Sequence, residues 1–266
     1  MKSEPSAIRM FPCLAAFEAT VQAHPEVLGA LYTGSLGRGT FDRFSDLDID
    51  LWVPDAWLDD RPSRLREVMG WLGEVQFLCG GTGFVGSDWR RVDLELPAPA
   101  DLKPDPHYAG ARVVKDTDGV LAQIVAESLP EVITTTLAQA RAVIEESIDS
   151  QIYLALHNAR GAVWSAMGEV SSRGIQLYQF LAELRGRRSY GPRYVETLLA
   201  PEEAALLTAA WPAAPEREEV RRAARALWVW TRYVWAEAER ALEARLEITL
   251  DEAALLAAVD RIYGWE

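Results

Sequence analysis

The composition of the chain changes near Asp118, and this change constrains the fold more than any other feature. Before it, short apolar runs alternate with Gly, Pro and Asp; after it, Ala, Leu, Glu and Arg dominate and Gly becomes rare. Short apolar runs bounded by turn residues predict strands, whereas long Ala- and Leu-rich runs predict helices. The sequence therefore predicts a small domain of strands and helices over residues 1–118, followed by a helical domain over residues 119–266.

Local patterns place the elements of the two halves. The expected strands are Val27–Tyr32, Leu47–Val53, Glu74–Leu78, Arg90–Leu96 and an edge strand at Arg112–Lys115, and the expected helices of this half are Phe11–Ala23 and Arg61–Leu72. The expected helices of the second half are Val132–Met167, Gly174–Leu184, Arg193–Ala200, Pro215–Ala244 and Leu250–Tyr263. All expected strands thus precede residue 118.

Charge and cysteine content exclude several classes of protein. Forty acidic residues against 27 basic ones leave a formal net charge of −13. A chain this acidic repels phosphate backbones, so we expect no general binding to nucleic acid, while a cationic small substrate is favoured. Cys13 and Cys79 are too few for a disulfide framework or a four-thiolate zinc site. Because no apolar run suits a signal peptide or a membrane span, we expect a cytoplasmic protein with no membrane partner.

Residues with chemical potential are concentrated between Gly34 and Asp50. The stretch reads Gly34-Ser35-Leu36-Gly37-Arg38-Gly39-Thr40 and, after Phe41–Phe44, Ser45-Asp46-Leu47-Asp48-Ile49-Asp50. A strand that runs into Gly-Ser can turn sharply and bring its backbone close to a bound group. The N–H groups of such a turn, the Ser35 hydroxyl and Arg38 could hold phosphate oxygens. By itself, a Gly-Ser turn is more often only a tight loop.

Three aspartates alternate with apolar residues in the strand after this turn. Residues i and i+2 of a strand share a face and lie about 6.5–7 Å apart, so Asp46, Asp48 and Asp50 point one way. Two unit charges about 4 Å apart repel by roughly 4 kcal/mol at an effective dielectric near 20. Three close carboxylates would therefore cost roughly 10 kcal/mol, against a typical stability of about 5–15 kcal/mol, unless protons or a cation compensate them. Hard oxygen ligands with room for phosphates are what Mg²⁺ prefers.

A second acidic strand could supply another carboxylate. In the run Trp89–Leu96, Asp93 and Glu95 alternate with apolar residues and share a face. Acidic strand faces are commonly just solvated. Two such strands, one of them directly after a Gly-Ser turn, nevertheless favour a metal site over a solvated surface.

These motifs resemble the signature of the DNA polymerase β-type nucleotidyltransferase superfamily, in which Gly34-Ser35 is followed after ten residues by Asp46-Leu-Asp48-Ile. The residues from Gly34 to Asp48 are most similar to antibiotic nucleotidyltransferases, which modify kanamycin and other aminoglycosides or lincosamides. Trp89–Leu94 resembles the strand that carries the family's third carboxylate. The resemblance is specific over about residues 27–53, extends to about residue 119, and is only architectural in the helical half.

The resemblance implies an α+β fold, with a small five-stranded mixed sheet and helices in a nucleotidyltransferase domain at 1–118 and an all-α domain at 119–266 that helps to form the substrate cleft. It implies metal-dependent transfer of a nucleoside monophosphate, AMP from ATP or its equivalent from another triphosphate, to a hydroxyl of a small molecule. An aminoglycoside-like antibiotic is the implied acceptor, pyrophosphate is the second product, and a homodimer is the implied assembly. The catalytic and Mg²⁺-binding residues would be Asp46, Asp48 and Asp93, and the triphosphate-binding residues Gly34, Ser35 and Arg38.

Several alternatives stay open at this point. The motif also fits Asp48-Ile-Asp50 after twelve intervening residues, although Asp46 and Asp48 are favoured because a serine precedes Asp46 as in the resistance enzymes. Asp93 or Glu95 could be the base toward the acceptor hydroxyl. Two other functions are adenylylation of a protein partner, as in nucleotidyltransferases paired with helical toxin partners, and nucleotide binding without catalysis.

Three features of the helical half are weaker candidates. His157 lies in a predicted helix, where a lone histidine is more often packed or exposed than catalytic. The basic cluster Arg185–Arg193 could reach a triphosphate or complement a helix C-terminus. Trp228 and Trp235 share a helical face and are expected in the core, whereas Trp230 lies off that face.

Overall fold

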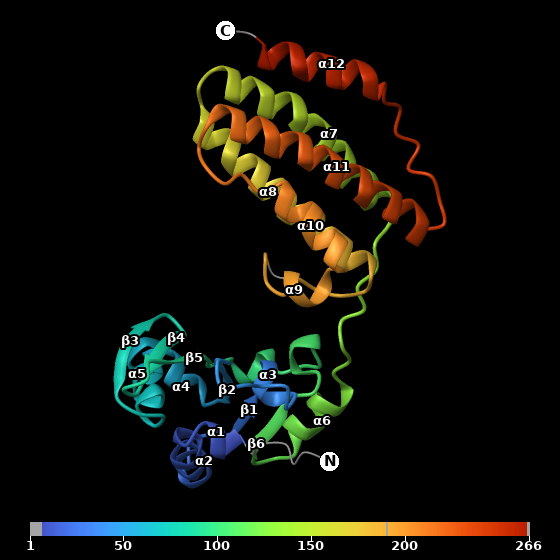
Figure 1. The fold of residues 1–266 in the computed structure, drawn as a ribbon. Helices are drawn as coiled ribbons and strands as arrows, with labels where there is room; N and C mark the ends of the chain where they lie inside the picture. Colours follow the sequence, from blue (N-terminus) through green and yellow to red (C-terminus); the bar gives the residue numbers. More distant parts are fainter. Residues whose placement is uncertain (1–6, 190, 265–266) are drawn as a thin grey trace. The chain divides into compact units, whose positions relative to one another are not determined.

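The computed structural model describes residues 7–189 and 191–264, so Tyr190 of the basic cluster lies outside the described residues. Contacts divide the chain into two compact units, residues 1–131 and 132–266, called here the sheet unit and the helical unit (Figure 1). The composition places this division at 118/119. The difference arises because α6 (Val120–Glu127) packs on the sheet, where Leu121 joins a core with Leu31 and Trp52.

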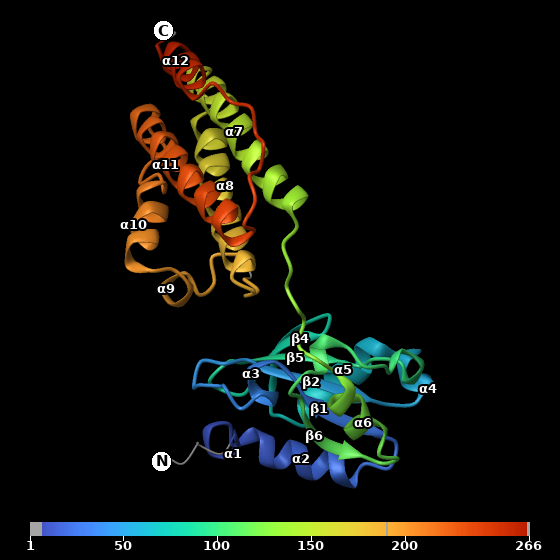
Figure 2. The same cartoon turned by 90° about the vertical axis from the view of Figure 1, so that its right-hand side faces the viewer.

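The sheet unit is built on one mixed six-stranded sheet in the order β3-β4-β5-β2-β1-β6 (Figure 1), and Figure 2 shows β4, β5, β2, β1 and β6 of this sheet from the side. The strands are β1 (Gly29–Tyr32), β2 (Leu47–Trp52), β3 (Val75–Cys79), β4 (Thr82–Val85), β5 (Arg90–Glu95) and β6 (Arg112–Asp116). β2 and β5 run parallel, and all other neighbours in this order are antiparallel. The expected α+β class is confirmed, but the expectation of five strands is wrong: β4 lies between glycines that are typical of a turn, which hides it in the sequence.

Short helices complete the sheet unit. They are α1 (Ala7–Met10), α2 (Cys13–Ala23), α3 (Gly34–Gly37), α4 (Asp55–Leu58), α5 (Arg61–Gly70) and α6, with 3-10 turns at η1 (Pro99–Asp101) and η2 (Pro106–Tyr108).

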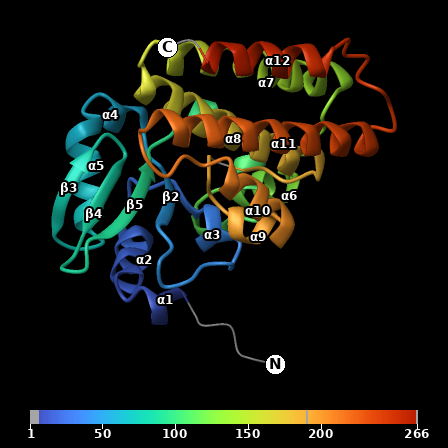
Figure 3. The same cartoon turned by 45° about the horizontal axis from the view of Figure 1, so that its top comes forward.

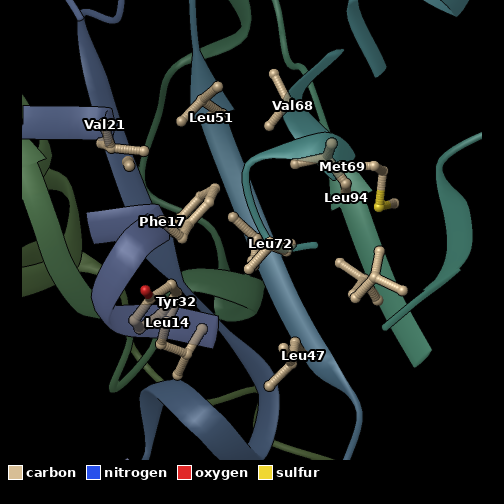
Figure 4. Close-up of a cluster of buried hydrophobic side chains, with 14 of the residues drawn as sticks. Leu14, Phe17, Val21, Tyr32, Leu47, Leu51, Val68, Met69, Leu72 and Leu94 are labelled. Carbon is tan, nitrogen blue, oxygen red and sulfur yellow. The ribbon is translucent and has the colours of Figure 1, made fainter. Parts of the chain in front are cut away.

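A hydrophobic core on one face of the sheet orients β2 and β5. Figure 4 shows this core with Leu14, Phe17 and Val21 from α2, Val68 and Met69 from α5, Leu47 and Leu51 from β2, and Leu94 from β5. Burial of each Leu, Val, Met or Phe side chain contributes about 1.5–3 kcal/mol. Because side chains alternate along a strand, burying Leu47 and Leu51 turns the aspartates of β2 to the opposite face.

A smaller core covers part of that opposite face. Leu31 of β1, Trp52 of β2 and Leu121 of α6 are buried together, and Tyr108 of η2 packs against them. The rings of Trp52 and Tyr108 are 5.7 Å apart. The aspartates therefore share their face with an apolar cluster that is centred on β1 and the end of β2.

The helical unit consists of α7 (Leu137–Ala159), α8 (Val163–Leu184), α9 (Val195–Leu198), α10 (Pro201–Ala209), α11 (Arg217–Ala241) and α12 (Glu252–Tyr263). α7, α8 and α11 pack along one another, α10 packs on α11, and α12 lies on α7 (Figure 3). Their shared core includes Leu154, Leu177, Tyr178, Leu227 and Trp230. Among the described residues, no helix is long and apolar enough to cross a membrane.

One helix expected in the helical unit is wrong in its bounds, and Trp230 lies in the core although it is off the face that Trp228 and Trp235 share. The helix expected at Val132–Met167 is two helices, because the chain turns at Gly161, whose φ of +78° lies in the left-handed region that favours glycine. Trp230 is fully buried, and its Nε1 donates a hydrogen bond to the Gly174 carbonyl (3.3 Å). It lies in the core because α11 packs against α7, α8 and α10, so that more than one of its faces is covered.

Candidate functional site

Two parallel neighbouring strands bring three carboxylates together. Asp48 of β2 lies directly opposite Asp93 of β5 in the register, and Asp46 immediately precedes β2. Each residue offers a carboxylate oxygen, and these three oxygens all lie within 4.8 Å of one another. In the part of the chain that the structure describes, this is the one group of acidic, His or Cys residues that could hold a metal ion. We call Asp46, Asp48 and Asp93 the carboxylate group.

Negative charge in the carboxylate group is only partly compensated. Burial, and to a smaller extent the charges of Asp46 and Asp93, raise the pKa of Asp48 to about 6. His107 and Arg91 act in the opposite direction, but their effects are smaller. Asp48 thus occupies a position where an added cation would relieve a real electrostatic cost.

Arg91 is part of this site, although it is not among the site residues predicted from the sequence. Its guanidinium bridges two of the carboxylates, with Nη1 3.2 Å from Asp46 Oδ2 and Nη2 2.8 Å from Asp93 Oδ2. The Thr82 hydroxyl of β4 donates a further hydrogen bond to Asp93 Oδ1 (2.7 Å). The signal in the sequence was the alternation itself, because Arg91 is two residues before Asp93 and so lies on the same face of β5.

The Gly34-Ser35 turn closes directly on the carboxylate group. The Thr33 amide donates to the Asp48 carbonyl (3.0 Å), which places the turn beside the start of β2. Gly34 has a φ of +55°, and a Cβ at this position would overlap Asp48 Oδ2. Glycine is therefore required here both by the backbone conformation and by the close approach of the carboxylate.

The hydroxyl groups of this turn are buried without a partner. Among the described residues, neither Thr33 Oγ1 nor Ser35 Oγ has a hydrogen-bond partner. A buried hydroxyl without a partner is costly, so such a group indicates a missing acceptor or donor. Arg38, at the end of α3, is exposed and lies beside Gly110, whereas Gly34 directly approaches the carboxylate of Asp48.

Asp50 does not join the carboxylate group. It is only 4% exposed, and its Oδ2 lies 3.2 Å from Nε2 of His107 in η2. This hydrogen bond is the largest influence on His107, and it raises the pKa of the imidazole. The arrangement favours Asp46 with Asp48 over Asp48 with Asp50 as the pair near a metal. The role of His107 gives no sequence signal, because 57 residues separate it from Asp50.

The remaining candidates lie in other surroundings. Glu95 is exposed and forms an ion pair with Arg61 (2.8 Å). The ring of His157 in α7 meets the ring of Tyr153 edge to face, with centroids 4.3 Å apart. Arg185, from the basic cluster, binds the buried carboxylate of Glu203. That hydrogen bond lowers the pKa of Glu203 to about 2, which is typical of a structural ion pair.

Comparison with known proteins gives similarity in fold only. No family model matches the sequence, and no curated protein matches it significantly. A crystal structure of an aminoglycoside 6-adenyltransferase from Bacillus subtilis is similar with 11% sequence identity and a TM-score of 0.45, covering 97% of this chain and 99% of that one. A nucleotidyltransferase-like protein from Exiguobacterium sibiricum 255-15 has 13% identity and a TM-score of 0.40, covering 96% and 87% of the two chains. Similarity at this level assigns no role to any residue of this chain.

Proposed function

We propose that this chain is an enzyme, a metal-dependent nucleotidyltransferase that moves a nucleoside monophosphate, AMP from ATP, to a hydroxyl group of a small molecule and releases pyrophosphate. The observation that carries the proposal is the carboxylate group, whose three oxygens lie within 4.8 Å of one another beside the Gly34-Ser35 turn. Phosphate-binding groups and metal-binding oxygens are thus adjacent, as the transfer of a nucleotidyl group requires.

The donor atoms of the carboxylate group fit a divalent cation such as Mg²⁺. Mg²⁺ is commonly held in proteins by one or two carboxylates together with the phosphates of a substrate. The raised pKa of Asp48 supports the same assignment, because three acidic side chains with one arginine leave net negative charge at the site. When bound, Mg²⁺ would supply positive charge that orients the triphosphate and offsets charge that develops during transfer.

The Gly34-Ser35 turn is the proposed phosphate site. Without a side chain, Gly34 lets a bound group approach the backbone next to Asp48. The buried Ser35 hydroxyl, which has no partner among the described residues, would donate a hydrogen bond to a phosphate oxygen. Arg38, which is exposed at the end of α3, would add positive charge beside the turn.

The transfer exchanges one bond to phosphorus for another. The acceptor oxygen forms a bond to the α-phosphorus while the bond from that phosphorus to the bridging oxygen breaks, and pyrophosphate leaves with the electron pair. The hydroxyl proton passes to Asp93, which Arg91 and Thr82 hold in place. Glu95 is the weaker candidate for this base because it is exposed and bound to Arg61.

The experiment is a pyrophosphate-release assay with Mg²⁺ and each of ATP, GTP, CTP and UTP, against a panel of small alcohols that includes aminoglycosides and lincosamides. The net charge of −13 favours a cationic acceptor, which makes aminoglycosides a reasonable first set. We expect release that depends on an acceptor, is abolished in Asp48→Asn and is retained in Asp59→Asn, which removes the same charge from an exposed position. Mg²⁺–nucleotide binding without release from any acceptor would contradict small-molecule transfer and indicate a protein acceptor or a binding role.

A further inference from the structure

The carboxylate face of the sheet continues onto its outer strands. Across the register, Asp93 of β5 pairs with Thr82 of β4, which pairs with Cys79 of β3. Two residues earlier in β5, Arg91 pairs with Phe84 of β4, and Phe84 pairs with Phe77 of β3. Directly paired residues of antiparallel strands lie on the same face. Phe84 and Phe77 therefore extend the row that begins at Arg91, on the face of the carboxylate group.

Three aromatic rings form a continuous row at this place. Phe77 and Phe84 have ring centroids 6.3 Å apart, and Phe84 and Trp89 have centroids 6.1 Å apart. Phe77 is 53% exposed and Trp89 is 58% exposed. We call Phe77, Phe84 and Trp89 the aromatic ladder. Since neighbouring strands are about 4.8 Å apart, Phe77 on β3 lies about 10 Å from Arg91 on β5, two strands away.

The backbone at Trp89 supports a role beyond packing. Its φ of +52° lies in the left-handed region, where a bulky side chain is a true outlier. Strained backbone of this kind concentrates at sites that bind ligands. Burial of the ring does not compensate for this strain, because most of the indole is exposed.

The other half of the same face is a closed core. There Leu31, Trp52 and Leu121 are buried together. The sheet thus has apolar side chains on both sides of the carboxylate group, buried toward β1 and exposed toward β3. An exposed row of rings next to a reactive group is typical of a surface that binds a ligand.

The charges around the aromatic ladder are already paired. Arg91 binds two carboxylates, and Arg61 is 2.8 Å from Glu95. Arg90 lies on the other face of the sheet, where its guanidinium covers the ring of Phe11. A polycation would meet Arg91 and Arg61 at the surface of the ladder, whereas a neutral aromatic ring would meet ring faces with compensated charges around them.

The position of the ladder relative to the phosphate turn suggests which substrate uses it. The Gly34-Ser35 turn follows β1 and approaches Asp48 from the β1 side of β2. The ladder lies on the opposite side, beyond β5. In an in-line displacement the attacking and leaving oxygens are on opposite sides of the phosphorus. An acceptor would therefore approach over β5 and β4.

We propose that the aromatic ladder binds the acceptor, and that this acceptor is a small neutral alcohol carrying an aromatic ring within about 10 Å of its reacting hydroxyl. The inference rests on the proposed nucleotidyl transfer and narrows its substrate class. It differs from the cationic acceptor that net charge alone favours.

The test uses phenyl β-glucoside and methyl β-glucoside as probes, because they differ only in the aryl group. Saturation-transfer NMR with the full chain measures contact between the protein and each probe. We expect transfer to the phenyl protons in wild type and none to the methyl glucoside. Phe77→Ser and Trp89→Gly should each weaken the phenyl signal about fivefold or more. Glycine adopts a positive φ without strain, so Trp89→Gly is expected to fold, and a loss of its signal reports the missing ring and not misfolding.

The matched control is Trp164→Ser, which removes an exposed ring from α8 (74% exposed) and should leave the signal unchanged. An aryl signal that is missing in wild type, or that survives both ladder variants, overturns the inference. A wild-type dimer that Phe77→Ser converts to monomer in sedimentation also overturns it, because the ladder would then be an interface between copies. Mg²⁺-dependent ATP binding is measured on the same samples. If the wild-type protein binds ATP but a probe result is negative, only the proposed role of the aromatic ladder is refuted. If the wild-type protein does not bind ATP, the proposed nucleotidyl transfer is refuted.

Discussion

Removing the charge of Asp48 is expected to stabilise the sheet unit while abolishing transfer. The pKa of Asp48 is raised from 3.8 to about 6, so the folded state holds this proton more tightly than the unfolded state. Stability consequently falls as pH rises from about 4 to about 6, and the full cost is present above that range. Two pH units correspond to about 3 kcal/mol, and the partly open position of the carboxyl reduces this to about 1–2 kcal/mol through solvent screening.

Asp48→Asn should therefore gain about 1–2 kcal/mol in free energy of unfolding at pH 8 without metal, and nothing at pH 4. Hydrogen exchange in urea, read on peptides of β2 and β5 by mass spectrometry, reports the sheet unit separately from the helical unit. Mg²⁺ should reduce the difference in free energy of unfolding between Asp48→Asn and wild type at pH 8, because a bound cation offsets the same repulsion in wild type. A variant that is no more stable at pH 8, or that is equally stabilised at pH 4, would refute the electrostatic reasoning.

The other predictions concern the turn, the bridging arginine and the helical unit. Gly34→Ala should lose about 2 kcal/mol or more in a thermal melt and lose nucleotide binding, because its Cβ would overlap Asp48 at a positive φ. Arg91→Gln should tighten Mn²⁺ binding without nucleotide about three- to tenfold, measured by electron paramagnetic resonance, because a competing cation is removed. Glu203→Ala should destabilise the helical unit by about 3–5 kcal/mol in a denaturant titration, because Arg185, the Tyr233 hydroxyl and the Ala200 amide all lose the buried carboxylate that accepts from them. In wild type, the contribution of Glu203 should be lost as pH falls from about 4.5 toward 2, since the Arg185 hydrogen bond lowers its pKa to about 2; a melt with no pH dependence in this range would contradict that assignment.

Much of the site follows from local sequence rules. The period-two pattern of β2 is enough to place Asp46 and Asp48 on one face, because burial of Leu47 and Leu51 leaves no other orientation. The same rule places Asp93 and Arg91 together on β5. What local rules do not supply is the pairing of β2 with β5, whose paired residues are 45 positions apart in the sequence and meet only in the folded sheet.

The features that the sequence does not reveal depend on distant contacts. β4 is short and flanked by glycines, and it is a strand because β3 and β5 pair with it on both sides. Asp50 alternates like its neighbours, yet η2 brings His107 to its carboxylate and separates it from the others. Trp230 is buried because α11 is packed on several sides, which the pattern of a single helix does not show.

Transfer of radioactive label from ATP tests the central claim most directly. ATP labelled at the α-phosphate is compared with ATP labelled at the γ-phosphate, with Mg²⁺ and the acceptor that gives pyrophosphate release. Nucleotidyl transfer through the carboxylate group predicts that the small molecule gains the α label and none of the γ label, in wild type and Asp59→Asn but not in Asp48→Asn. Label from the γ position on the acceptor, or α label that persists in Asp48→Asn, would contradict the account.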